Sequence, residues 1–205
     1  MKLAVFAATV ASAAAFAPGV RTSTTSSVHA FANGMVGSEG PEPMPFTPTG
    51  NQSSKNFDPA GFAERAPDWL PWFREAELKH GRAAMLAAAG FVVPEFVRIP
   101  GEQFSFAALP RVIDAHDALP ESMIQIFLWI SFLEAVSFPA LANMNEFDRQ
   151  PGDFGFDPLG LYPTDPAKRK ERQLQELKNG RLAMIAIGGM VAGASITGNG
   201  FPYLP

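Results

Sequence analysis

The sequence predicts an all-α integral membrane fold with three transmembrane helices, of which the first and third are crossed and related by a pseudo-two-fold axis. Two observations predict this fold: an internal repeat at an offset of 99 residues, and an apolar segment between the two copies. The composition agrees with it, because 47% of the residues are hydrophobic and only 18% are charged.

The composition also excludes several classes of function. The chain has no cysteine, so it has no disulfide framework, thiolate metal site or cysteine nucleophile. A formal net charge of -4 argues against nucleic-acid binding, which needs a basic face. Its Glu and His residues are accompanied by no nucleophile, glycine-rich loop or paired-carboxylate motif of a soluble hydrolase, so we expect no enzyme activity.

The N-terminal segment predicts targeting. Residues 1–15 combine one lysine, a short apolar run and small residues, which is typical of a secretory signal peptide. Residues 16–31 are rich in hydroxyl side chains and contain no acid, which is typical of a transit peptide. The Ala-Phe-Ala-Pro junction at 15–18 resembles the bipartite plastid signals of algae with secondary plastids. A signal peptide followed by a disordered secreted N-terminus is the alternative. Residues 32–205 then form the mature domain, which opens with an irregular arm.

The two copies of the repeat, residues 57–92 and 156–191, each begin with a loop and continue into a helix. The loop residues that match are Phe57, Asp58, Pro59 and Gly61 in the first copy and Phe156, Asp157, Pro158 and Gly160 in the second. Further along, Glu-Leu-Lys-His-Gly-Arg at 77–82 matches Glu-Leu-Lys-Asn-Gly-Arg at 176–181. The apolar residues that follow each block predict a helix with a polar N-terminal half and an apolar C-terminal half.

The segment from Ser122 to Asn143 predicts the middle helix. Pro120 and Glu121 open it, and Glu134 is its one internal charge. Its length of about 33 Å matches a hydrocarbon core. With three spans the two repeat copies run in the same direction, which places the axis along the membrane normal. Four basic residues precede the third helix, so the positive-inside rule places the helix N-termini in the stroma.

Charged residues inside the first and third helices need partners, because an unpaired charge in a bilayer is costly. Two helices that cross would bring Glu77 to Arg181 and Glu176 to Arg82, whereas glutamate and arginine of one block are too far apart around the helix to pair well. Small residues would let the backbones approach closely: Gly81, Ala84 and Ala88 in the first helix, and Gly180, Ala183 and Gly189 in the third.

The ion pairs leave His80 and Asn179 unexplained. An imidazole nitrogen, an amide oxygen and the spare oxygen of a paired carboxylate can each donate a lone pair to Mg²⁺. Free Mg²⁺ takes about six oxygen ligands, whereas Mg²⁺ already held by a tetrapyrrole needs one axial donor. Single donors scattered over several helices therefore predict a pigment scaffold.

The middle helix adds two candidate ligands. Gln125 and Glu134 are nine residues apart, on nearly opposite sides of a helix, so each would face a different pigment. A structural hydrogen bond is the alternative for Glu134. His116 lies in the loop before this helix, where a pigment ligand and a solvated surface residue are equally good interpretations.

At these residues the chain resembles the light-harvesting chlorophyll-binding protein family over about residues 57–205, and with its presequence it is most similar to the fucoxanthin chlorophyll a/c-binding branch of red-lineage algae. The resemblance implies chlorophyll ligation by Glu77, His80, Glu176 and Asn179, with Arg82 and Arg181 completing the inter-helix pairs. It also implies two carotenoids in the grooves of the crossed helices, with their end groups near the Phe57–Gly61 and Phe156–Gly160 loops. A turn that enters a helix is the alternative for these loops.

The resemblance further implies chlorophyll a, chlorophyll c, fucoxanthin and related carotenoids such as diadinoxanthin as cofactors. It places the protein in the chloroplast thylakoid membrane with a stromal N-terminus, beside neighbouring antenna subunits and a photosystem I or II core. The chain lacks the amphipathic C-terminal helix and terminal pigment-ligating histidine of the green-plant antenna, so a pigment bound there would be absent or held otherwise.

Light harvesting is the function that these observations favour. The alternative within the family is photoprotective dissipation, in which lumenal acidic residues would sense acidification. The loop at 98–121 offers only four acidic residues for this, which favours harvesting: Glu102, Asp114, Asp117 and Glu121. A small transporter built on repeats is disfavoured, because apart from Glu134 the apolar helix halves offer no polar lining.

Overall fold

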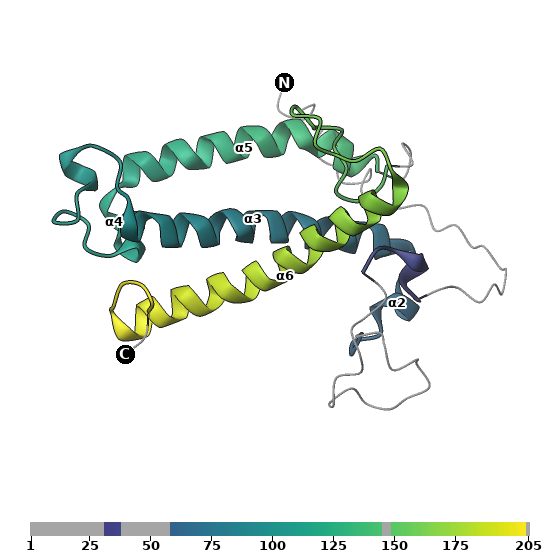
Figure 1. Ribbon diagram of the computed structural model, residues 1–205, viewed down its shortest axis with the longest axis horizontal. Coiled ribbons are helices and arrows are strands. Elements are labelled where there is room, and N and C mark those ends of the chain that lie inside the picture. The colour runs from purple at the N-terminus through teal and green to yellow at the C-terminus, as the bar shows by residue number, and fades with distance from the viewer. Residues whose placement is uncertain (1–30, 38–57, 145–148, 204–205) are drawn as a thin grey trace, which may run out of the picture.

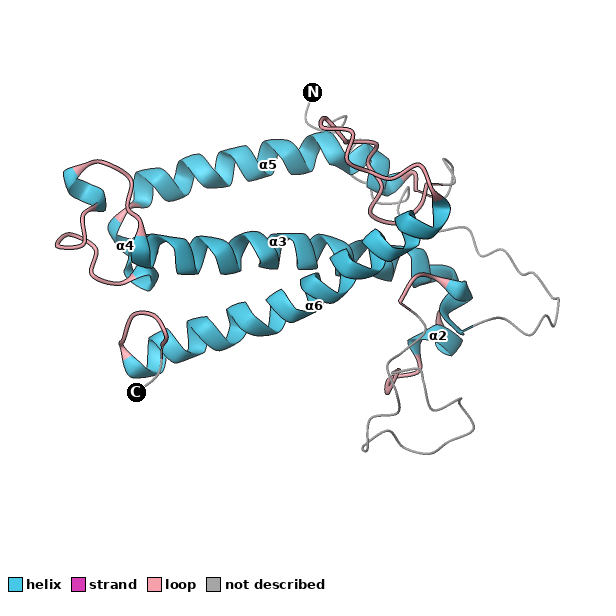
Figure 2. Cartoon of the chain, viewed as in Figure 1, coloured by secondary structure: helices cyan, strands magenta, loops and turns pink. Residues whose placement is uncertain are grey.

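The computed structural model describes residues 31–37, 58–144 and 149–203, and within these ranges the chain is helical and forms no strand (Figures 1 and 2). Three helices are long: α3 (Leu70–Phe96), α5 (Pro120–Ala142) and α6 (Pro166–Thr197). The short elements are η1 (Phe31–Gly34), α2 (Phe62–Arg65), η2 (Pro67–Trp69), η3 (Glu102–Phe104), η4 (Val112–Asp114) and α4 (Ala115–Ala118). The predicted signal peptide, the transit peptide up to residue 30, and Phe57 lie outside the described residues.

The helix ends follow from local sequence. A proline stands in the first turn of each long helix, where its missing N–H needs no partner: Pro71, Pro120 and Pro166. In α6 the Asp165 side chain also accepts a hydrogen bond from the Ala167 N–H at 3.0 Å, and Gly198 ends the helix in a left-handed conformation. The ends of α5 agree with the predicted middle helix to within two residues.

Helices α3 and α6 begin at the same end of the molecule and cross, whereas α5 runs in the opposite direction (Figure 1). Gly81 and Gly180 meet at the crossing: a Cβ atom on Gly81 would lie 3.0 Å from the Gly180 Cα, and a Cβ on Gly180 would lie 3.0 Å from the Gly81 Cα. Ala84 and Ala183 are buried one turn further along. Only small residues allow so close an approach.

One predicted contact residue is wrong. Gly189 was expected to face the first helix, but it is exposed and a Cβ there would meet no atom within 4 Å. The helices diverge beyond the crossing (Figure 1), so two turns after Gly180 they are already apart. Small residues therefore serve the close approach only around the crossing itself.

Helix α5 is apolar along its length, and none of the residues in its most apolar stretch is buried. Its large exposed side chains are Ile124, Ile126, Phe127, Leu128, Trp129, Ile130, Phe132, Leu133, Val136 and Phe138. Two helices of the described chain, α5 and α6, are long and apolar enough to cross a membrane; α3 is not among them. The charged residues of α3 account for the difference: Glu75, Glu77, Lys79 and Arg82 lie in its N-terminal half and Glu95 lies near its end.

Candidate functional site

The two repeat loops have the same hydrogen bonds. Asp58 accepts from the N–H groups of Phe62 at 3.1 Å and Ala63 at 2.8 Å. At the equivalent positions Asp157 accepts from the N–H groups of Leu161 at 3.1 Å and Tyr162 at 2.9 Å. In both loops the aspartate carbonyl also accepts from the glycine three residues later, at 3.2 Å. The aspartate of each motif thus organises a tight turn.

The glycine of each motif is required by backbone conformation. Gly61 has φ +67° and Gly160 has φ +61°, a left-handed conformation that other residues adopt at a cost. The backbone N–H groups of Tyr162 and Leu161 hold the pKa of Asp157 below its usual value. Phe156 is 86% exposed, so the aromatic ring of this motif faces outward and has no packing role within the described chain.

Two reciprocal ion pairs join α3 and α6 on either side of the crossing. The Arg82 Nε donates to Glu176 Oε1 at 2.7 Å, and the Arg181 Nε donates to Glu77 Oε1 at 2.7 Å. All four side chains remain partly exposed. Each arginine occupies one carboxylate oxygen and leaves the other able to donate a lone pair.

The two glutamates differ in a second neighbour. Arg74 Nη1 lies 3.4 Å from Glu77 Oε2. The equivalent residue in the second copy is Gln173, which donates to the Tyr162 hydroxyl at 2.8 Å. Glu176 therefore has the less encumbered free oxygen of the two.

His80 is exposed and has a defined tautomer. Its Nδ1 lies 2.8 Å from the Ala76 carbonyl oxygen. A carbonyl only accepts, so in the neutral ring Nδ1 carries the proton and Nε2 keeps its lone pair. A backbone hydrogen bond to the second ring nitrogen is the usual support for a histidine that binds a metal. Asn179, at the equivalent position in α6, is also exposed, so both side chains point away from the crossing.

Gln125 lies in a groove on one face of α5. The groove has a volume of about 470 Å³ and is lined by Glu121, Ile124, Gln125, Leu128, Trp129 and Phe132. The Gln125 amide and the Glu121 carboxylate are the two polar side chains among aliphatic and aromatic ones, a lining that suits a flat apolar ligand with few polar contacts.

Glu134 lies further along α5 and forms an ion pair with Lys79 of α3, a contact that the sequence reasoning missed. His116 lies in the short helix α4, where its Nδ1 is 3.0 Å from Asp117 Oδ1 and both side chains are almost fully exposed. This placement leaves both interpretations of His116 open.

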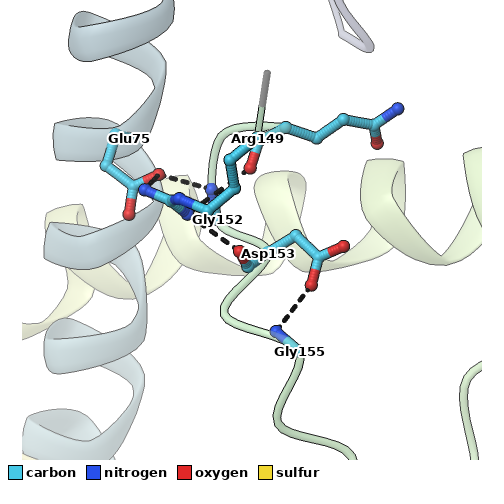
Figure 3. A network of polar contacts seen from close by, with 6 residues as sticks. Glu75, Arg149, Gly152, Asp153 and Gly155 are labelled. Carbon is cyan, nitrogen blue, oxygen red and sulfur yellow. Dashed lines mark hydrogen bonds and ion pairs between the residues drawn. The ribbon is translucent and has the colours of Figure 1, made fainter. Parts of the chain in front are cut away.

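The sequence reasoning also missed a buried clasp between α3 and the loop that precedes the second repeat (Figure 3). Glu75 is 2% exposed; its Oε2 accepts from the Gly152 N–H at 2.5 Å and lies 3.1 Å from Arg149 Nη2. The Arg149 guanidinium also covers the Phe154 ring and donates to the Asp153 carbonyl. A signal was available, because Glu75 is an acid where the second copy has Leu174.

Arg149 also helps to line a larger cavity of about 1160 Å³, where the end of α5 meets this loop and the start of α6. Its walls include apolar residues of α5, such as Val136 and Ala140, and basic residues of α6, such as Arg169. The clasp therefore positions one wall of this cavity.

The donors do not form a free-metal centre. No group of three or more His, Asp or Glu side chains suited to an ion occurs within residues 31–37, 58–144 and 149–203. Instead, single lone-pair donors lie along the exposed faces of the helices. Three of them, Glu77, Glu134 and Glu176, each pair with a cationic side chain of a neighbouring helix. This donor set fits the axial ligation of Mg²⁺ in tetrapyrroles.

Comparisons with known proteins agree with this chemistry. A family model described as chlorophyll A-B binding protein matches residues 42–195. A fucoxanthin-chlorophyll a-c binding protein from Chattonella marina var. antiqua is 44% identical over 147 residues, which cover 70% of this chain and 66% of that protein. A second fucoxanthin-chlorophyll a-c binding protein, from Isochrysis galbana, is 35% identical over 171 residues, covering 74% of this chain and 77% of that protein.

Light-harvesting complex stress-related protein 1 from Chlamydomonas reinhardtii is also 44% identical, over 150 residues, which cover 66% of this chain and 58% of that protein. The chain thus spans two thirds or less of the length of the first relatives that it matches. The family model covers most of the chain and contains both repeat copies completely. This protein therefore belongs to the chlorophyll a-b binding protein family.

Proposed function

We propose that the protein is a light-harvesting antenna subunit that binds chlorophylls and carotenoids and passes excitation energy to a photosystem. The observation that carries the proposal is the pair of reciprocal ion pairs at the crossing, in which each arginine donates to one carboxylate oxygen and the second oxygen of Glu176 stays free. Such an ion pair lowers the energetic cost of a carboxylate inside a membrane and leaves an oxygen that can bind Mg²⁺. An antenna performs no covalent chemistry, so the protein's task is to hold pigments at set positions and orientations.

Six side chains are the proposed axial ligands of chlorophyll Mg²⁺: Glu77, His80, Gln125, Glu134, Glu176 and Asn179. The free Nε2 of His80 and the apolar groove around Gln125 support their assignment. Bound chlorophylls would cover the apolar surface that α5 leaves exposed, which explains why this helix packs so little against protein. His116 is the seventh candidate ligand.

The Asp58–Gly61 and Asp157–Gly160 turns are the proposed contacts of carotenoid end groups, with Phe57 and Phe156 beside them. Their shared hydrogen bonds explain the motif as a turn, and the exposed Phe156 ring is available to an apolar ligand. The fucoxanthin-chlorophyll relatives support chlorophyll a, chlorophyll c and fucoxanthin as the pigments; diadinoxanthin is a further candidate.

In the proposed topology α3, α5 and α6 all cross the thylakoid membrane, with a pseudo-two-fold axis through the crossing of α3 and α6. The shared direction of these two helices supports it. The basic residues Lys168, Arg169, Lys170 and Arg172 at the start of α6 support a stromal N-terminus. Residues 1–15 and 16–31 are the proposed signal and transit peptides, and residues 32–205 the antenna domain beside a photosystem I or II core and other antenna subunits.

Extraction and chromatography of the pigments from the purified native protein test this proposal. Chlorophyll a with chlorophyll c and fucoxanthin is the expected result. Chlorophyll a with other carotenoids would keep the antenna function and contradict the fucoxanthin assignment. A native protein without pigment would overturn the proposal.

Photoprotective dissipation of excess excitation is a second candidate function, and the similarity to light-harvesting complex stress-related proteins favours it. The two functions differ in their response to acid. The chlorophyll fluorescence lifetime of the purified protein, measured at pH 7 and pH 5, separates them. A harvesting protein keeps its lifetime, and strong shortening at pH 5 would assign the protein to dissipation.

A further inference from the structure

Glu134 is the one charged residue in the apolar segment 122–143. Its side chain is 51% exposed and follows Leu133, which is itself exposed, on a helix that packs little against protein. In a bilayer this carboxylate would face hydrocarbon or bound pigment, where an uncompensated charge is strongly unfavourable.

Lys79 of α3 supplies the compensating charge. Its Nζ forms an ion pair with Glu134 Oε2, and this is the one ion pair between α3 and α5 in the described ranges. The lysine engages one carboxylate oxygen and leaves Oε1 free to donate. Glu77 and Glu176 show the same arrangement, in which a cation from the neighbouring helix occupies one oxygen.

We propose that Lys79 is the positioning residue of a third charge-compensated pigment site: it neutralises and orients Glu134 from α3, so that the free oxygen of this carboxylate binds the Mg²⁺ of a tetrapyrrole between α3 and α5. This inference rests on the proposed pigment-binding function and adds to it the residue on which one ligand depends. The ligand class is a magnesium tetrapyrrole, because the site offers a single axial oxygen in apolar surroundings.

The repeat supplies the comparison that isolates this role. Lys178 occupies the position of Lys79 in the second copy, within the same Glu-Leu-Lys sequence. It is exposed, and no ion pair joins it to a carboxylate in the part of the chain that the structure describes. Helix α5 lies beside α3, so only the lysine of the first copy meets a third helix.

A purely mechanical tie between α3 and α5 is the rival explanation of the Lys79–Glu134 pair. The two explanations differ in what happens when both charges are removed together. If the pair only holds the two helices together, the uncharged double variant loses this link and should lose pigment as the single variant does. A compensated ligand is restored by Lys79→Met combined with Glu134→Gln, because the glutamine oxygen is neutral and still able to bind Mg²⁺.

The experiment compares chlorophyll per polypeptide in the full chain refolded with its native pigments, for the unchanged protein and four variants. These are Lys79→Arg, Lys79→Met, Lys79→Met with Glu134→Gln, and Lys178→Met as the matched control. We expect Lys79→Met to lose about one chlorophyll, and the other three variants to keep the full number. Visible circular dichroism should change in the single variant and recover in the double one.

Full pigment in Lys79→Met would overturn the inference, since the ligand would not need the lysine. Loss in both Lys79→Met and the double variant, whether of one pigment or of all, would also overturn it and assign the pair to a mechanical tie. If Lys178→Met lost as much chlorophyll as Lys79→Met, the two lysines would not differ in role, and this result would also contradict the inference. An unchanged protein that binds no pigment would refute the proposed function itself, which is a distinguishable result.

Discussion

The first and second copies of the repeat have the same turn and the same crossing but different surroundings. Asp58 and Asp157 make equivalent hydrogen bonds, Gly81 meets Gly180, and the two Glu–Arg pairs have equal lengths of 2.7 Å. The two copies are therefore alike in their contacts within one copy, such as the turns, and in their contacts with each other, such as the crossing.

The two copies differ where a segment outside the repeat contacts only one of them. Glu75 in α3 binds Arg149 of the loop, whereas its counterpart in α6 is Leu174. Lys79 binds Glu134 of α5, whereas Lys178 has the same sequence neighbours and no such pair among the described residues. The repeat thus builds a crossing with reciprocal contacts, and other parts of the chain give the first copy contacts that the second copy lacks among the described residues.

The largest expected effect is loss of the crossing. Arg82→Leu leaves Glu176 unpaired in the membrane and should abolish pigment-dependent folding. Arg181→Leu should have a smaller effect, because Arg74 Nη1 stays 3.4 Å from the other carboxylate oxygen of Glu77. His80→Ala should instead remove about one chlorophyll and leave the others in place. Pigment analysis of refolded variants checks this, and equal pigment loss in Arg82→Leu and His80→Ala would contradict the division between ion pair and ligand.

The clasp predicts the next largest effect, confined to the first copy. Arg149→Leu leaves the buried Glu75 carboxylate without its cation and should reduce the free energy of unfolding by about 3–5 kcal/mol. Adding Glu75→Leu, which gives α3 the residue type that α6 has, should recover most of this loss. Thermal unfolding of the pigmented protein measures both, and a double variant no more stable than Arg149→Leu would count against the assignment.

The contact between Gly81 and Gly180 predicts a smaller effect that is equal for both copies. Gly81→Ala and Gly180→Ala each place a Cβ 3.0 Å from the opposite backbone, which should cost about 1–3 kcal/mol of stability. Gly189→Ala is the matched control, because its Cβ would meet open space. Unfolding temperatures should fall for the first two variants only; a similar fall for Gly189→Ala would show that helix flexibility, and not close approach, is the cause.

The smallest effect concerns acid and the second loop. The N–H groups of Tyr162 and Leu161 lower the pKa of Asp157, so its contribution to loop stability is complete above the unfolded value of 3.8 and is lost as pH falls through the lower folded value. Hydrogen-exchange protection of these two amides should be equal at pH 7 and pH 5 and should fall only below 3.8. Protection already lost at pH 5 would contradict this, and Asp157→Asn is the control without the titration.

Much of the crossed pair could be predicted because the repeat carries its own constraint. Two matching blocks, each with an internal glutamate and arginine, neutralise these charges most simply by pairing each glutamate with the arginine of the other block, and the structure contains those pairs. Gly189 was misjudged because small residues along a helix do not reveal where two axes separate. Glu75 and Lys79 were missed because their partners lie 74 and 55 residues away, in segments without repeat counterparts.

The long helices, the turns and the reciprocal pairing follow from the amino-acid sequence alone, since these depend on local spacing and on the match between the two repeat copies. The packing of the helices shows that α5 runs alongside α3 and that, of the two equivalent lysines, Lys79 is the one that meets a carboxylate. The tertiary structure likewise decided that Arg149 covers Glu75. An apolar helix such as α5 carries no sequence pattern that favours one repeat copy over the other, so its partner is known only from where the folded chain places it.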